Sequence, residues 1–236
     1  MKKILFSLVA LVCSMSMNAQ VMKVMKNGEE VATYQGAEYS VVFEEELKST
    51  PTSTSTGTSK RYSNIDVAWV QLWDNGPKFA EYNVGATSVN EYGGYYCWGS
   101  SLDKDSDAAY KSGTDALTGT DDTATNLWGS NWRMPTQAEL QALLENCDVE
   151  WITVNDMNGC KFTGKNNYAS NSVFFPAAGD YVNGKVSGIP GRLGFYWSSS
   201  PCGNDSFCLS IFSHTQNVYN DGPRNYSYSV RAVLAE

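Results

Sequence analysis

One well-marked helical pattern, at residues 135–146, most constrains what this chain can fold into. Thr136 and Glu139 have the spacing of a capping box, with Pro135 just ahead of them. Apolar side chains then recur at helical spacing, as Leu140, Leu143 and Leu144. We therefore predict one main capped helix whose leucine stripe faces a core.

The segments around this helix are short and strand-like, with loops between them. Runs rich in aromatic and β-branched residues occupy residues 67–70, 94–98 and 172–175. A hairpin is expected directly after the helix, turning near Asn158-Gly159. These patterns predict a loop-rich α+β domain over residues 65–236, with a mixed or antiparallel sheet.

The first 19 residues have the pattern of a secretory signal peptide. Two lysines precede an apolar run over residues 4–12, and small and polar residues then place cleavage after Ala19. The run is too short to span a bilayer, and no later stretch is apolar enough to do so. Lipidation at Cys13 is disfavoured because Val12 is bulkier than the residue usual before a lipidated cysteine. We expect a secreted or outer-surface protein, with the periplasm as the alternative.

Behind the leader, residues 20–47 are predicted to form a small β unit. An alternating run that turns at Asn27-Gly28 predicts a two-residue hairpin, and residues 39–43 predict a third strand. So small a sheet needs to pack against something to be stable. Residues 48–64 are rich in Ser and Thr with almost no apolar side chain, which is typical of a flexible linker.

The chain is acidic, and this argues against two classes of partner. Its formal net charge is −8, and loss of Lys2 and Lys3 with the leader makes it −10. An acidic surface repels phosphate backbones and anionic lipids. We therefore expect no nucleic-acid partner and no membrane-surface binding.

Export permits disulfide bonds, but an odd number of cysteines remains after cleavage. The five are Cys97, Cys147, Cys160, Cys202 and Cys208. The pairing we favour first is Cys147 with Cys160, and Cys202 with Cys208 would clip a hairpin. The alternative for each is a buried free thiol that packs as a small apolar side chain.

The C-terminal segment between Pro201 and Ser229 has an unusual composition. It contains no Lys, Glu, Met or Trp and a single Gln, Gln216. Ser, Asn, Tyr, Asp, Phe, Gly and Cys take their place, together with His214, the only His of the chain. This composition resembles a binding paratope more than a catalytic centre. The alternative is a Ser/Tyr/Asn-rich β-meander whose skew is chance.

Candidate metal and catalytic patterns are incomplete. Asp103, Asp105 and Asp107 alternate as in a calcium loop, but the turn glycine and the bidentate Glu are missing. A single His, His214, does not make a typical zinc site or a hydrolase triad. We predict no metal site, no cofactor and no enzymatic activity, with calcium at the three aspartates left as the open alternative.

Six blocks in a fixed order resemble a known family. They read FAEYNVGA, YGGYYCWG, WRMPTQAEL, FFPAAG, GFYWSSS and SVRAV, at residues 79–86, 92–99, 132–140, 174–179, 194–200 and 229–233. Together they are similar to the Fibrobacter succinogenes major paralogous (FISUMP) domain of secreted bacterial proteins. The resemblance covers residues 65–234 and implies a C-type-lectin-like fold, in which the terminal strands pair. The Glu-Pro-Asn, Gln-Pro-Asp and Trp-Asn-Asp motifs of calcium-dependent sugar-binding lectins are absent.

The same resemblance implies a place for ligand binding. Variable proteins of diversity-generating retroelements share this fold. In those proteins, mutagenesis of adenines converts Asn codons into codons for a set of residue types like that found in residues 201–229. The candidate ligand-binding residues are Cys202, Asn204, Asp205, Phe207, Ile211, His214, Asn217, Tyr219, Asp221, Arg224, Asn225 and Tyr226. Phe212 is a further candidate aromatic anchor.

Large side chains outside this segment are expected to be structural. Arg231 lies mid-strand in an apolar run, which predicts a buried ion pair or bonding to the backbone. A core position is expected for Trp98, Trp132, Trp151 and Trp197. It is also favoured, against exposed sugar-binding platforms, for Trp69, Trp73 and Trp128.

These observations favour an exported binding protein that presents its C-terminal strands to a protein or glycan whose identity is unknown. The alternative is a structural surface or matrix protein without a dedicated ligand. An enzyme built on the same fold, as the formylglycine-generating enzymes are, is least favoured, because no pair of reactive cysteines is evident.

Overall fold

The structure is a computed structural model that describes residues 65–89, 91–104, 110–187 and 189–235, and the backbone of five strands before them. The chain divides into two compact units, Met1–Thr56 and Gly57–Glu236. The predicted linker, residues 48–64, lies outside the described residues.

The N-terminal unit consists of strands, which are β1 (Lys2–Ser7), β2 (Leu11–Met15), β3 (Val21–Lys26), β4 (Glu29–Gln35) and β5 (Tyr39–Glu44). β1 pairs in parallel with β5, and β2, β3 and β4 form an antiparallel sheet. The pairing of β3 with β4 matches the hairpin expected from Asn27-Gly28. β1 and β2 fall inside the predicted leader, and cleavage after Ala19 stays a prediction.

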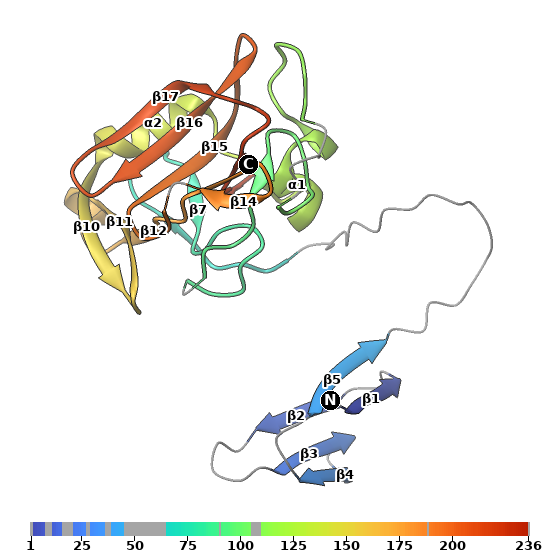
Figure 1. The fold of residues 1–236 in the computed structure, drawn as a ribbon. Coiled ribbons are helices and arrows are strands. Elements are labelled where there is room, and N and C mark those ends of the chain that lie inside the picture. The colour runs from blue at the N-terminus through green and yellow to red at the C-terminus, as the bar shows by residue number, and fades with distance from the viewer. Residues whose placement is uncertain are drawn as a thin grey trace. The chain divides into compact units, whose positions relative to one another are not determined.

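The second unit is an α+β fold made mostly of short antiparallel strands (Figure 1). One sheet has the order β6-β7-β19-β9, formed by Trp69–Gln71, Lys78–Ala80, Val233–Leu234 and Trp132–Arg133. A second has the order β14-β13-β18-β8, formed by Lys185–Ser187, Asp180–Val182, Ser227–Tyr228 and Tyr96–Cys97. The last residues of the chain therefore pair with its earlier segments in both sheets.

Two longer three-stranded sheets complete the unit. One contains β10 (Cys147–Val154), β11 (Met157–Gly164) and β12 (Ser172–Pro176). The other contains β15 (Leu193–Cys202), β16 (Asp205–Phe212) and β17 (Gln216–Gly222). The helices are α1 (Thr123–Trp128) and α2 (Gln137–Asn146), with short 3-10 turns at Gly119–Asp121 and Asn166–Tyr168. No helix of the described part combines the length and the apolar character that a bilayer crossing requires.

Helix α2 is the predicted main helix, and its N-terminus is capped as the sequence indicated. The hydroxyl of Thr136 accepts from the Glu139 N–H at 3.2 Å, and the Glu139 carboxylate accepts from the Thr136 N–H at 2.7 Å. Burial opposes ionisation of Glu139, but hydrogen bonds from Arg133 and Thr136 outweigh it and hold its pKa below the usual value. Leu140 and Leu143 are fully buried. The helix is therefore fixed at its start and along one face.

Replacing the cap should have a moderate effect on stability. We expect Thr136→Ala to lower the free energy of unfolding by about 1 kcal/mol, because the Glu139 N–H loses its acceptor. Chemical denaturation monitored by circular dichroism measures the difference. Thr114→Ala, at an exposed position, serves as the control and should change little. Equal stability of the two variants would contradict the structural role of the cap.

The hairpin after α2 turns three residues earlier than the sequence suggested. Its turn residues are Asn155 and Asp156, with φ of 45° and 64°, and Val154 pairs with Met157. Gly159 instead lies within β11, where an added Cβ would stand 2.2 Å from the carbonyl oxygen of Phe175 on β12. The glycine is needed for close packing of neighbouring strands and not for a turn. Another hairpin turns at Asn183-Gly184, between β13 and β14.

The disulfide predicted between Cys147 and Cys160 does not form in this structure. Cys160 is paired with Trp151, which lies four positions from Cys147 on β10, roughly 13 Å along the strand. A disulfide requires Cα atoms within about 7 Å. Only twelve residues separate the two cysteines in the sequence, but the strand register places them apart.

The predicted pairing of Cys202 with Cys208 is also absent. Cys208 is paired with Trp197, five positions before Cys202 on β15. All five described cysteines are free thiols. Burial raises the pKa of Cys147 to about 11 and the pKa values of Cys160 and Cys208 to about 12. These three thiols are therefore protonated at neutral pH and chemically unreactive.

The tryptophans divide into core and surface positions. Most are buried, namely Trp98, Trp128, Trp132 and Trp197. Trp73 and Trp151 are half-buried. Trp69 is 48% exposed, which corrects the core position favoured for it. It lies on β6, the edge strand of its sheet, and Lys78 covers its ring at 5.0 Å.

Arg231 is buried and bonds chiefly to the backbone, as one of the two predicted alternatives states. Its guanidinium donates to the carbonyl oxygens of Ala80 and Phe174 at 2.9 and 2.8 Å and to the side-chain oxygen of Asn83 at 2.9 Å. It also lies 4.6 Å from the centre of the Phe175 ring. Arg231 thus joins its own segment to two others, residues 80–83 and residues 174–175.

Candidate functional site

The sheet formed by β15, β16 and β17 has two different faces. On one face, Tyr196, Leu209 and Ile211 are fully buried in a cluster that includes Leu140 and Leu143 of α2. This is the face that α2 covers, and the helix lies behind the three strands in Figure 1. The alternate positions of the strands belong to the opposite face. That opposite face carries the candidate site.

The opposite face contains a hollow with an aromatic floor. Its volume is about 260 Å³. We call it the aromatic hollow, and it is lined by Phe195, Cys208, Phe212, Tyr219, Asp221, Gly222 and Tyr228. The register explains the grouping, since Cys208 pairs with Tyr219 across β16 and β17 and with Trp197 across β15 and β16. Residues from four strands therefore meet at one place.

The floor of the aromatic hollow is held by contacts between rings. Tyr228 stacks on Phe195 at 4.9 Å between ring centres and packs on Trp197 at 4.2 Å. Phe212 meets Phe195 edge-on at 6.2 Å. Trp197 is fully buried, and its indole N–H donates to the carbonyl oxygen of Tyr96 at 2.8 Å. A floor that is packed and hydrogen-bonded in this way is fixed before any ligand arrives.

Gly222 gives the hollow its depth on the β17 side. An added Cβ at this position would stand 2.6 Å from the Trp197 ring and 2.8 Å from the carbonyl oxygen of Ser206. The backbone of β17 can therefore approach the indole only because position 222 carries no side chain.

The rim of the hollow is polar and exposed. Tyr219 is 39% exposed, and Asp221 and Asn217 are exposed on the same strand. Cys208 lies at the bottom, where burial first and the charge of Asp221 second raise the pKa of its thiol to about 12. Burial likewise raises the pKa of Tyr228 above its usual value. Asp221 is thus the charged group at the rim, above a neutral floor.

The other candidate residues at the ends of β16 do not line this hollow. Asn204 is exposed in the turn between β15 and β16, with Cys202 and Asp205 half-buried beside it. His214 is exposed in the turn at the other end of β16, where its Nδ1 lies 3.0 Å from the Ser213 hydroxyl. The eight residues of β16 separate the two turns by roughly 25 Å. The structure therefore does not bring these residues into one site.

Three further candidates lie near β16 or in the loop after β17. Phe207 is half-buried, and its carbonyl oxygen accepts from the Ser198 hydroxyl at 2.8 Å. Asn225 is exposed in the loop that follows β17. Tyr226 is half-buried in that loop, and its ring meets Tyr228 edge-on at 6.4 Å. Tyr226 therefore borders the floor of the hollow.

Two candidate residues, Ile211 and Arg224, are buried and not at the surface. Ile211 has no exposed surface and packs on the α2 side of the sheet. Arg224 is 3% exposed, and its guanidinium lies 4.1 Å from the centre of the Trp98 ring. It donates to the carbonyl oxygens of Lys111, Gly113 and Asp205 at 2.7 to 3.1 Å. Arg224 therefore ties surface loops to the core.

The sequence interpretation missed two residues of the floor. Phe195 lies before the skewed segment and Tyr228 at its end, so the composition singles out neither of them. The alternation of Phe195 with Trp197 was the available signal, since residues two apart on a strand face the same side. The two residues belong to the scaffold and to the hollow at once.

Side chains that could hold a metal ion are not clustered among the described residues. Asp103 accepts from the Tyr95 N–H at 2.8 Å and lies 3.8 Å from the Lys104 ammonium, while Asp105 and Asp107 lie outside the described residues. The described part of the chain contains no cluster of three or more His, Cys, Asp or Glu side chains suited to a metal ion.

Comparison with known proteins adds no relative: no protein-family model, no curated protein and no solved structure matches the chain. The resemblance to the FISUMP domain therefore stands on its six sequence blocks alone. The contacts and distances within the aromatic hollow do not depend on that resemblance.

Proposed function

We propose that this chain is an exported binding protein that takes its ligand where the face of β15, β16 and β17 opposite α2 reaches the surface, with the aromatic hollow as the anchor pocket. The observation that carries the proposal is the preformed floor of Phe195, Phe212 and Tyr228 beneath an exposed Tyr219. Rigid aromatic side chains that need little ordering are the usual source of affinity in protein recognition.

The lining of the hollow favours a protein partner. Its floor consists of aromatic rings and a protonated thiol, so it suits a single apolar or aromatic side chain better than a polyhydroxylated ring. Asp221 stands at the rim, and the whole chain is acidic. Charge complementarity then calls for a Lys or Arg beside the apolar anchor of the partner. We infer a basic, apolar segment of a protein as the ligand.

We also propose that the second unit belongs to the FISUMP family and has a C-type-lectin-like fold. Its support is the pairing of terminal segments, since Val233 of β19 pairs with Phe79 of β7. Most of the quoted blocks form the buried scaffold around the hollow, including Trp98, Trp132 and Trp197. Export is proposed from the leader pattern in residues 1–19.

Short peptides test the anchor pocket without knowledge of the natural partner. The mature chain is titrated with the tripeptides Lys-Trp-Lys, Gly-Trp-Gly and Lys-Gly-Lys while backbone and side-chain NMR shifts are followed. We expect Lys-Trp-Lys to bind best, with the largest shifts at Phe195, Phe212 and Tyr219. Its affinity should decrease as salt is added, because the contribution of Asp221 is electrostatic.

Two exposed tyrosines provide the matched variants for this titration. Tyr219→Ala should weaken binding of Lys-Trp-Lys by about tenfold, the equivalent of about 1.4 kcal/mol. Tyr110→Ala removes a side chain that is 49% exposed outside the hollow and should leave binding unchanged. Shifts that scatter over the surface, or equal binding by both variants, would reject the hollow as an anchor pocket.

A further inference from the structure

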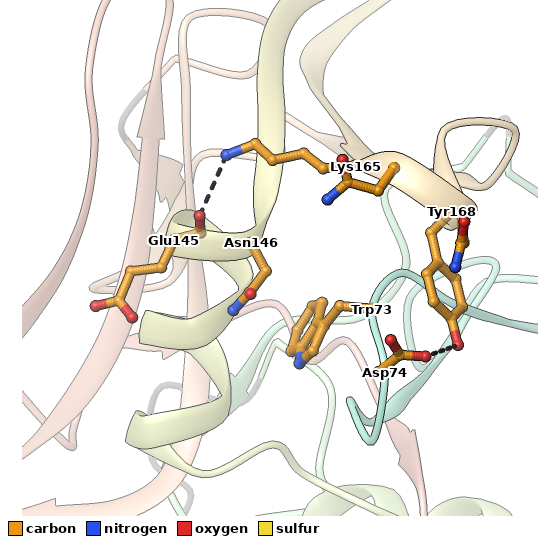
Figure 2. Close-up of a pocket in the computed structure, with 8 residues that line it drawn as sticks. Trp73, Asp74, Glu145, Asn146, Lys165 and Tyr168 are labelled. Atoms are coloured by element: carbon orange, nitrogen blue, oxygen red, sulfur yellow. Dashed lines mark hydrogen bonds between the residues drawn. The ribbon is translucent and has the colours of Figure 1, made fainter.

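A second hollow, of about 270 Å³, lies at the C-terminal end of α2. Figure 2 shows Trp73 at its centre, with Asn146 on one side and Asp74 and Tyr168 on the other, and with Lys165 across the top. None of these residues belongs to the aromatic hollow or to its sheet. We call this place the Trp73 pocket.

Trp73 is held in position by the tight turn that it begins. The Gly76 N–H donates to the Trp73 carbonyl oxygen at 3.1 Å, and Asn75 adopts a φ of 57° within the turn. The indole folds back over Gly76, where an added Cβ would stand 2.5 Å from the ring. The Trp73 ring also packs on Phe79 at 6.2 Å between centres. The indole is half-buried and remains part of the pocket wall.

The opposite wall is tied to the same turn. The Tyr168 hydroxyl donates to Oδ1 of Asp74 at 3.0 Å, and the Asn171 amide donates to the Gln71 carbonyl oxygen at 2.8 Å. The hydrogen bond to Asp74 also raises the pKa of Tyr168. Two contacts between segments about one hundred residues apart therefore fix the width of the pocket before a ligand binds.

The third wall is the end of α2. Nδ2 of Asn146 donates to the Ala142 carbonyl oxygen at 2.8 Å, so its Oδ1 is left to accept a hydrogen bond. The Lys165 ammonium donates to the Glu145 carbonyl oxygen at 3.2 Å and lies 3.8 Å from Asp148. An ammonium has three donors, and not all of them are used by these contacts.

The polar groups of the pocket are mixed in type and balanced in charge. Asp74 and Asn146 offer acceptors, and Lys165 offers donors. The Glu145 carboxylate accepts from the Gln141 amide at 3.0 Å and points away from Trp73 in Figure 2, so the charges left at the pocket are the Asp74 carboxylate and the Lys165 ammonium. The Asp74 carboxylate repels an anionic ligand, and the Lys165 ammonium repels a cationic one. The charges of the pocket therefore favour neither kind of ligand. A wholly apolar ligand would displace water from these groups and offer their remaining donors and acceptors no hydrogen bond in its place.

We propose that the Trp73 pocket binds one ring of a neutral saccharide. A pyranose ring has an apolar face of C–H groups that can lie on the Trp73 indole, and hydroxyls at its edge that both donate and accept. The volume fits a single ring, since pockets for larger ligands start at about 300 Å³. This site is independent of the protein-binding face proposed above, and either can fail without the other.

Methyl glycosides of glucose, galactose, mannose and N-acetylglucosamine test the proposal on the mature chain. The chain has seven Trp, and the indole N–H NMR signal lost in Trp73→Phe belongs to Trp73. We expect at least one glycoside to shift this signal in a saturable way, with a dissociation constant in the millimolar range. No shift up to about 50 mM, where such a ligand saturates its site, would overturn the proposal.

Two aspartates provide the matched variants. Asp74→Ala removes the acceptor at the pocket and should weaken binding by about tenfold or more, as loss of a hydrogen bond to a charged group predicts. Asp115→Ala removes an exposed carboxylate outside the pocket and should bind as the unaltered chain does. Tyr219→Ala should also leave glycoside binding unchanged. Binding that survives in Asp74→Ala, or that is lost equally in Asp115→Ala, would refute the assignment.

Discussion

Arg231→Ala should lower the free energy of unfolding by about 4 kcal/mol or more. The substitution leaves the carbonyl oxygens of Ala80 and Phe174 and the side-chain oxygen of Asn83 buried without their donor. Each such group costs about 1–3 kcal/mol, and the lost side chain also leaves a cavity. Burial lowers the pKa of Arg231 to about 10, although Tyr196 partly offsets the shift, so Arg231 still carries its charge at neutral pH.

Thermal and chemical unfolding of the purified chain measure this loss. Arg192 is exposed and provides the matched control, since Arg192→Ala removes the same side chain from the surface. That variant should stay within about 0.5 kcal/mol of the unaltered chain. If Arg231→Ala were as stable as Arg192→Ala, Arg231 would not be the link between core segments described above.

Trp197→Ala should cost about 3–5 kcal/mol, as removal of a fully buried indole does elsewhere. The ring supports Tyr228 at 4.2 Å and donates to the Tyr96 carbonyl oxygen, so the floor of the aromatic hollow should collapse with it. Near-ultraviolet circular dichroism and denaturation report both effects.

Trp69→Ala is the control for this substitution, because Trp69 is 48% exposed. It loses mainly the contact with Lys78, which is worth about 0.5–1 kcal/mol at an exposed site. A loss from Trp197→Ala no larger than the loss from Trp69→Ala would mean that the hollow does not depend on its buried indole.

The sequence predicted local structure well because the signals for it are local. The capping box of Thr136 and Glu139 and the leucine stripe lie within one helix, and α2 starts where they indicate. Gly159 was misread because a glycine serves a turn and a close strand contact equally well, and only the β11–β12 pairing distinguishes the two. The cysteine pairs failed because strand register is set by the whole sheet.

The composition of the C-terminal segment does not show which of its residues face the core and which face the surface. Tyr219 and Ile211 are both candidate residues from this segment, yet Tyr219 lines the hollow and Ile211 packs under α2. Arg224 shows the same limit, because a charged residue in a polar loop was expected at the surface and is instead buried over Trp98. Position within the segment does not reveal which side a strand residue faces until register is known.

A peptide-display selection against the mature chain tests the central claim most directly. The counter-target is the double variant Tyr219→Ala with Asp221→Ala, which keeps the buried floor and removes the rim of the hollow. The account predicts enrichment of peptides with an aromatic or large apolar residue flanked by Lys or Arg, and loss of their binding to the double variant. Absence of enrichment, or equal binding to both targets, would contradict the claim and favour a structural surface protein.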